Sequence, residues 1–257
     1  MDDEDVVFDV HDYLARFSGV AGECGFSRQV IAEVDGYEIP AFVRRAEAAP
    51  RVYVSSGMHG DEPAGPLALL ELLKEGLFES EVEWMLCPMM NPTGVSRGCR
   101  ENHQGLDLNR DYFRRASAEV GGHVAWLEQQ PVPDVFLSLH EDWESTGFYL
   151  YEIQKCAFAS VAHAILQSAA REIAPEPSSL IDDHAVREPG WIFHKPEADF
   201  PEDWPEAIYM ANMGTQVSYT FETPSSLELE KRINCHKLAL NKAVEEFLNV
   251  ERHFEGQ

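Results

Sequence analysis

The chain has 257 residues, 44% of them hydrophobic, and its 45 acidic and 20 basic side chains give a formal net charge of −25 at pH 7. This content can bury one large core, so we expect a single α/β domain over residues 1–257. The charge argues against nucleic acid or an anionic membrane surface as a partner. No apolar stretch approaches the roughly 18 residues of a membrane span.

Two features of the sequence predict a cytoplasmic protein. The acidic start over residues 1–5 is the opposite of the cationic start of a signal peptide. Five cysteines occur without a Cys-x-x-Cys pair, which favours reduced thiols. Solubility is the simplest reason for the negative charge, and attraction of cationic substrates is the alternative.

Apolar periodicity and turn residues predict alternating elements. A helix near 10–17 and a hairpin over 29–45 that turns at Asp35-Gly36 form an N-terminal edge over 1–45. Strands follow near 51–55, 82–87, 134–139, 147–153 and 217–222, with helices near 63–75, 117–129, 156–173 and 226–249. This alternation predicts a mixed, mostly parallel central sheet with helices on both faces.

His59 and Glu62 lie three residues apart, directly after the apolar run over 51–55. An imidazole and a carboxylate at this spacing can converge on one Zn²⁺ and leave a position open for water. Pro63 can begin a helix, because its missing N–H is not needed there. The pair is therefore expected where a strand ends and a helix begins. By itself, His-x-x-Glu is a weak pattern in a chain so rich in acidic residues.

A second metal-ligand candidate, His140, ends the apolar run that starts at Asp134. Ligands of open α/β sheets gather outside the carboxyl ends of the strands, so His140 can meet His59 and Glu62 there. A histidine that simply ends a strand and hydrogen-bonds to a loop is the commoner alternative.

The segment 91–111 combines many turn formers with three arginines, Arg97, Arg100 and Arg110. Arginine offers a planar fork of donors that suits a carboxylate or a developing oxyanion. A solvated loop whose arginines offset nearby acidic residues is the simpler explanation.

Residues 175–205 hold six of the chain's 15 prolines and lead into an acidic cluster. Regular structure is not expected there, and we predict a long loop region beside the cleft over 175–216. Trp191, Phe193 and Trp204 can wall this cleft, or they can hold a surface flap in place.

Four separated motifs resemble those of the M14 family of zinc metallocarboxypeptidases, which have the carboxypeptidase A-like fold. In chain order they are His59-Gly-Asp-Glu62; Asn91-Pro-Thr-Gly94 with Arg100-Glu-Asn102 and Gly105-Leu-Asp-Leu-Asn109-Arg110; Leu139-His140; and Thr220-Phe-Glu222-Thr-Pro224. The short interval from Arg100 to Asn109 makes the bacterial murein-peptide amidases and cytosolic carboxypeptidases look nearer than the digestive enzymes.

This resemblance implies a catalytic set. His59, Glu62 and His140 would hold one Zn²⁺ per chain, the ligand set that is known for carboxypeptidase A itself. Glu222 would be the general base, and Arg100 would polarise the scissile carbonyl.

The resemblance also implies a substrate-binding set. Asn109 and Arg110 would bind the terminal carboxylate of the substrate. Digestive relatives place a mobile tyrosine well upstream of the base, and Tyr209 is the only candidate on such a segment, because Tyr219 is too close to Glu222.

We therefore expect a zinc-dependent metallocarboxypeptidase that hydrolyses the C-terminal amide bond of a peptide or peptide-like substrate with a free terminal carboxylate. The first alternative is a zinc amidohydrolase of the succinylglutamate desuccinylase and aspartoacylase type, which acts on N-acyl amino acids. Such domains usually add a carboxy-terminal β module, for which little chain remains after Glu222. The second alternative is a non-catalytic zinc- or peptide-binding protein, which would need neither Glu222 nor Arg100. The leaving residue and the oligomeric state stay open.

Overall fold

The structure, a computed structural model, describes residues 8–47, 49–79, 82–157 and 159–255. The acidic start over 1–5, on which the argument against a signal peptide depends, lies outside these ranges. So does residue 158 of the helix that we expected over 156–173.

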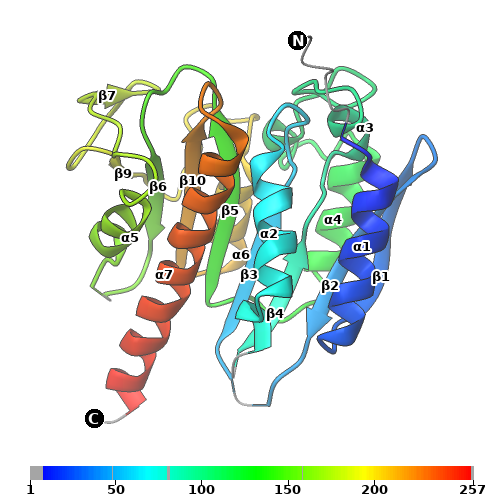
Figure 1. The fold of residues 1–257 in the computed structure, drawn as a ribbon, viewed down its shortest axis with the longest axis horizontal. Coiled ribbons are helices and arrows are strands. Elements are labelled where there is room, and N and C mark those ends of the chain that lie inside the picture. Colours follow the sequence, from blue (N-terminus) through cyan, green and yellow to red (C-terminus); the bar gives the residue numbers. More distant parts are fainter. Residues whose placement is uncertain (1–7, 48, 80–81, 158, 256–257) are drawn as a thin grey trace.

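An eight-stranded sheet runs through the middle of the molecule in the order β1-β2-β4-β3-β5-β10-β6-β9, and β7 and β8 form a separate small sheet (Figure 1). The strands are β1 (Ser27–Val34), β2 (Tyr37–Arg44), β3 (Arg51–Ser56), β4 (Glu83–Cys87), β5 (Val135–Asp142), β6 (Tyr149–Gln154), β7 (Leu180–Ile181), β8 (His184–Ala185), β9 (Trp191–Phe193) and β10 (Val217–Pro224). The central neighbours β4, β3, β5 and β10 are parallel, whereas β1, β2 and β6 each have antiparallel partners. The mixed sheet with a parallel centre confirms the predicted fold class.

The parallel centre determines where functional side chains can meet. Parallel strands point the same way, so the carboxyl ends of β3, β5 and β10 lie at one edge of the sheet. The register places Glu222 of β10 beside His140 of β5. β3 ends at Ser56, shortly before His59.

Helices cover both faces of the sheet, with α1, α2 and α7 in front of it and α4 and α6 behind it in Figure 1. The helices are α1 (Val10–Glu23), α2 (Ala64–Lys74), α3 (Pro92–Val95), α4 (Ala118–Leu127), α5 (Ala162–Ala169), α6 (Glu206–Met213) and α7 (Leu229–Glu255), with short 3-10 turns at η1 (Leu77–Glu79) and η2 (Leu108–Arg110). None of the helices in the described part of the chain combines the length and apolar character that a bilayer crossing requires.

Apolar side chains along the central strands alternate between the two faces of the sheet, which explains why helices cover both faces. Val52 and Val54 of β3 belong to the apolar cluster that includes side chains of α1, α2 and α7. Tyr53, which lies between them, belongs to the cluster that includes side chains of α4 and α6. On β5, Leu137 and Phe136 divide between the same two clusters. Each central strand is thus buried on both faces, as parallel sheets require.

The structure also corrects one sequence expectation. Residues 175–205 were expected to lack regular structure, but they contain β7, β8 and β9, and β9 extends the main sheet by pairing with β6. Helix α6 follows within the region 175–216 that was predicted to be a loop.

Candidate metal centre and active-site cavity

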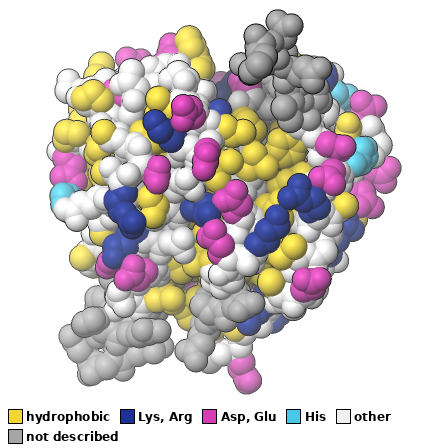
Figure 2. All heavy atoms as spheres, in the orientation of Figure 1, with side chains coloured by type: hydrophobic (Ala, Val, Ile, Leu, Met, Phe, Trp, Pro, Cys, Tyr) yellow, Lys and Arg dark blue, Asp and Glu magenta, His cyan; other side chains and the backbone are white. Residues whose placement is uncertain are grey.

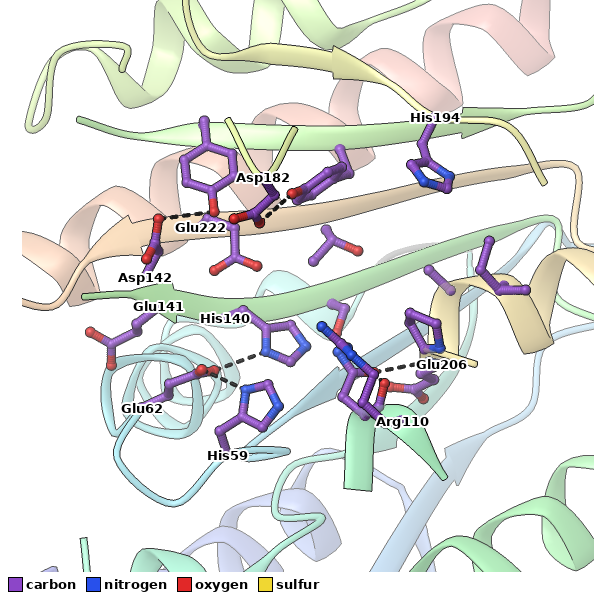
Figure 3. A pocket seen from close by; sticks show the side chains of 18 of the residues that line it. His59, Glu62, Arg110, His140, Glu141, Asp142, Asp182, His194, Glu206 and Glu222 are labelled. Carbon is purple, nitrogen blue, oxygen red and sulfur yellow. Dashed lines mark hydrogen bonds and ion pairs between the residues drawn. The ribbon is translucent and has the colours of Figure 1, made fainter. Parts of the chain in front are cut away.

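Three side chains that the sequence indicated as metal ligands lie together. His59 lies in the loop after β3, Glu62 lies just before α2, and His140 lies near the end of β5. All three are buried, and one ligand atom from each lies within 4.8 Å of the others. Glu62 Oε1 is 2.5 Å from His59 Nδ1, and Glu62 Oε2 is 2.9 Å from His140 Nδ1 (Figure 3). We call these residues the His-Glu-His cluster.

The loop that carries His59 fits only because Gly60 has no side chain. A Cβ at this position would lie 2.0 Å from the carbonyl carbon of Gly94 and 2.3 Å from the carbonyl oxygen of Cys99. The Gly60 N–H donates to the carbonyl of Arg100 at 3.3 Å. The close approach therefore holds the Arg100 segment against the metal-ligand loop.

Asp107 orients the first ligand. His59 Nε2 donates to Asp107 Oδ1 at 3.2 Å, while Arg100 Nε and Nη2 donate to Asp107 Oδ2 at 3.1 and 3.0 Å. A carboxylate behind a metal-binding imidazole sets its tautomer and its orientation. Asp107 belongs to the motif Gly105-Leu-Asp-Leu-Asn109-Arg110, but the sequence alone did not indicate a role for it.

The donor atoms fit a metal ion. With its proton on Nε2, His59 presents a lone pair at Nδ1, and Arg100 Nη1, which can only donate, lies 3.2 Å from that atom. The same lone pair faces the Glu62 carboxylate, another acceptor, at 2.5 Å. A proton on Nδ1 or a metal ion between the two atoms resolves this contact, and two imidazoles with one carboxylate form the donor set of a catalytic zinc site.

The electrostatics at the cluster agree with this fit. Burial lowers the pKa of His59, but the Glu62 carboxylate and the Asp107 hydrogen bond outweigh it and raise the pKa to about 9. Burial would raise the pKa of Glu62, but His59 and His140 reverse this and hold its pKa below the usual range. Burial lowers the pKa of His140. The site thus favours one positive charge shared among an ionised carboxylate and two imidazoles.

Glu222 lies beside the cluster in a cavity of about 390 Å³ (Figure 3). Burial, and then the carboxylates of Glu62 and Asp142, raise the pKa of Glu222 well above its usual range. A cation at the His-Glu-His cluster would lower this pKa again, because positive charge favours the ionised carboxylate. The carboxyl group can therefore hold or release a proton according to the charge beside it.

The three side chains of segment 91–111 that we expected at the site also line this cavity: Arg100, Asn109 and Arg110. Arg100 Nη1 is 3.6 Å from Glu62 Oε1, so its guanidinium lies at the edge of the cluster. Asn109 Oδ1 accepts the backbone N–H of Glu206 at 2.9 Å, which leaves the NH₂ group of Asn109 to donate to a ligand. Arg110 is exposed, and its Nη1 donates to the carbonyl of Asn109 at 2.9 Å.

The structure does not bring Tyr209 to the cavity. Its hydroxyl lies 3.4 Å from Glu128 Oε1, and its ring packs against Tyr112 in the core behind the sheet. Two other tyrosines, Tyr149 and Tyr151 of β6, line the cavity instead. Their alternating positions on a strand were the only sequence signal for this placement.

Further polar residues, to which the sequence reasoning assigned no role in the site, also line the cavity: Ser138, Glu141, Asp142, Glu144, Asp182, His184, His194, Asp199, Glu206, Ser218 and Thr220. The segment 175–205 therefore does wall the cleft. The lining residues from this segment are Asp182, His184, His194, Asp199, Phe200 and Pro205, whereas Trp191, Phe193 and Trp204 are not among them. Trp204 packs on Phe113 instead.

Comparisons with known proteins agree with the fold and the cluster, which resemble those of carboxypeptidase-like hydrolases. A family model described as the succinylglutamate desuccinylase/aspartoacylase catalytic domain matches residues 48–171. The murein peptide amidase A of Vibrio campbellii is 24% identical over 226 residues, which cover 84% of this chain and 79% of the relative.

Solved structures agree with this class. A candidate metallopeptidase of Shewanella amazonensis superimposes with a TM-score of 0.82 at 25% identity, covering 93% of each chain. A metallo-carboxypeptidase of Burkholderia cenocepacia shares the fold, with a TM-score of 0.65 at 16% identity over 93% of this chain and 69% of the other. The comparisons confirm the resemblance to M14-like metallocarboxypeptidases that the four motifs indicated.

Proposed function

We propose that the protein is a zinc-dependent metallocarboxypeptidase that hydrolyses the C-terminal amide bond of peptide or peptide-like substrates. The observation that carries the proposal is the His-Glu-His cluster, which shares one cavity with the buried acid Glu222 and with the cationic side chains Arg100 and Arg110. The similarity to a murein peptide amidase supports a peptide-like substrate. A cytoplasmic location remains a prediction from the sequence.

His59, Glu62 and His140 would hold one zinc ion. When bound, zinc supplies Lewis acidity, which lowers the pKa of water toward about 7 and polarises carbonyl groups. Glu222 would accept a proton from the attacking water and donate it to the leaving amine. Arg100, which Asp107 holds in place, would stabilise the negative charge that develops on the carbonyl oxygen.

Recognition of the terminal carboxylate would fall to Asn109 and Arg110. Arginine forms bidentate pairs with carboxylates, and the side-chain NH₂ of Asn109 adds a further donor. Eight acidic residues and two arginines line the cavity, so its permanent positive charge lies on Arg100 and Arg110. A substrate carboxylate would be directed there.

The decisive experiment replaces the proposed base. Glu222→Gln should lower turnover by about 10²- to 10⁴-fold, because it removes the proton acceptor and keeps the shape. Metal analysis should find the same zinc content in this variant as in the wild type, and Glu172→Gln on the exposed surface is the matched control. Loss of metal together with activity would make Glu222 a structural residue and remove the proposed role.

A second candidate function is that of a zinc amidohydrolase acting on N-acyl amino acids. The match of residues 48–171 to the desuccinylase/aspartoacylase domain specifically favours it. Hydrolysis of C-terminal peptides and N-acyl amino acids, each with and without chelator, separates the two. Turnover of N-acyl amino acids alone would select the second function.

A further inference from the structure

A second group of metal-binding side chains lies in the cavity wall. His184 belongs to β8, His194 follows β9, and Asp199 lies in the loop before α6. One ligand atom from each lies within 4.8 Å of the others. Figure 3 shows His194 well apart from His59 and His140, so the two groups are separate. We call this the His-His-Asp cluster.

The hydrogen bonds of His194 leave a lone pair facing Asp199. Nδ1 of His194 is 2.6 Å from the carbonyl oxygen of Lys195, which can only accept, so Nδ1 carries the proton. In a neutral imidazole, Nε2 then has a lone pair, and it lies 3.2 Å from Asp199 Oδ2. His184 Nε2 lies 3.4 Å from the same oxygen. The Asp199 carboxylate and the Nε2 atoms of both histidines thus converge on one point, where a bound cation would be favourable.

The ligand-bearing segments are fixed by contacts of their own. The backbone N–H of His194 donates to the carbonyl of Glu152 at 2.8 Å, and His184 pairs with Ile181 across the β7–β8 turn. The two imidazole rings are T-shaped at 4.8 Å, and Tyr151 packs against both rings at 5.9 and 6.2 Å. The protein itself therefore holds the two histidines in place, and this lowers the cost of ordering them around an ion.

We propose that His184, His194 and Asp199 form a second divalent-metal site that fixes the wall of the cavity. Two imidazole nitrogens and one carboxylate oxygen suit Zn²⁺ or a similar transition-metal ion rather than Ca²⁺ or Mg²⁺, which prefer oxygen ligands. An ion there would join the β7–β8 turn to the loop that follows β9.

A metal ion at the His-His-Asp cluster would affect the catalytic cavity through Asp182. This residue lies on the β7–β8 turn, two positions before His184, and accepts a hydrogen bond from the Tyr151 hydroxyl at 2.6 Å. Asp182 and Tyr151 both line the cavity that contains Glu222. Metal at the His-His-Asp cluster would therefore hold this wall in one position, whatever substrate the enzyme cleaves.

Counting bound ions tests the proposal. The full-length protein is stripped with chelator and titrated with Zn²⁺ by calorimetry and with Co²⁺ by visible absorption. The wild type should bind two ions per chain. His140→Ala should retain the second ion, and His194→Ala in that background should weaken its binding by at least about 100-fold, since even loss of an outer-shell partner costs about 10- to 100-fold.

Two further variants complete the test. Asp199→Asn should also weaken binding of the second ion, while His163→Ala should leave two ions bound, because it removes an exposed histidine that pairs with Glu188 and Gln167. Circular dichroism checks that each variant folds, and His184→Gln provides a second ligand substitution if His194→Ala does not. Metal should also protect the segment 175–205 from proteolysis in the His140→Ala background, but not after His194→Ala. One ion in the wild type, or a second ion that binds as tightly after His194→Ala as before it, overturns the proposal.

Discussion

At the scale of single residues, Asp107 connects two proposed functions, because it accepts hydrogen bonds from both His59 and Arg100. Asp107→Ala should lower zinc affinity by about 10- to 100-fold, since the imidazole loses the group that sets its orientation. Competition with a zinc chelator measures this. Glu101→Gln, in the same segment but exposed, should not change the affinity. Equal affinities for the wild type and Asp107→Ala would show that the loop alone positions His59.

Sequence motifs identified most of the candidate site, and the reason is local. His59 and Glu62 lie three residues apart on the chain, and His140 and Glu222 each lie near the end of a recognisable strand. The role of Asp107 depends on which imidazole nitrogen it meets, 48 residues away in sequence, and no periodicity encodes that contact. The same limitation explains the guess for Tyr209, since only tertiary packing directs a helical tyrosine to the core or to the cavity.

Glu206, a buried residue outside the metal centre, should make the stability of the protein depend on pH. It is buried and accepts hydrogen bonds from Tyr53 at 2.8 Å and Ser55 at 2.7 Å. Burial outweighs these hydrogen bonds and raises the pKa of Glu206 to about 7 from an ordinary value of 4.5. Between these two pH values the folded protein keeps a proton that the unfolded chain has lost. Stability therefore falls as pH rises through this window, by about 3 kcal/mol at most.

Replacing Glu206 by glutamine should remove that contribution. Urea unfolding of Glu206→Gln between pH 4.5 and pH 7 should show a smaller loss of stability with rising pH than the wild type. Glu202→Gln, an exposed acid nearby, should follow the wild-type curve. Parallel curves for Glu206→Gln and the wild type would contradict the assigned pKa.

At the scale of secondary-structure elements, the loop between β3 and α2 tolerates no side chain at position 60. Gly60→Ala should destabilise the protein by about 1–3 kcal/mol or more, because a Cβ would overlap backbone atoms of Gly94 and Cys99. It should also weaken zinc binding, since His59 is the adjacent residue. Chemical unfolding and metal titration measure the two effects.

A second glycine supplies the matched control. Gly19 is exposed in helix α1, and a Cβ there would meet nothing within 4 Å. Gly19→Ala should stabilise the protein by about 0.5–1 kcal/mol, because alanine favours the helix. If Gly60→Ala behaved like Gly19→Ala, the close approach at position 60 would not be real.

The elements that the sequence predicted are those with a local signal. The central strands are continuous apolar runs, and α2 and α7 have apolar stripes at helical spacing. Strand β9 has three residues and exists only because its backbone pairs with β6. Helix α6 did carry helix-boundary residues, Pro205 before it and Gly214 in the left-handed conformation after it, but the surrounding proline-rich stretch favoured a loop.

At the scale of the whole molecule, the formal charge of −25 creates repulsion that opposes folding. On the face shown in Figure 2, acidic and basic side chains are interspersed, and such surface pairs contribute little each. Screening by salt weakens repulsion and attraction alike, but the large excess of acids makes the repulsion the greater of the two.

Added salt should therefore stabilise the zinc-loaded protein. Its Tm should rise as NaCl increases from about 10 to 150 mM, over which the screening length falls from about 30 to 8 Å. Near the sequence pI of about 4.6 the net charge disappears, so the same salt series should leave the Tm nearly unchanged. A Tm that falls with salt at pH 7 would mean that favourable ion pairs outweigh the net repulsion, and the distribution of charge would then matter more than its sum.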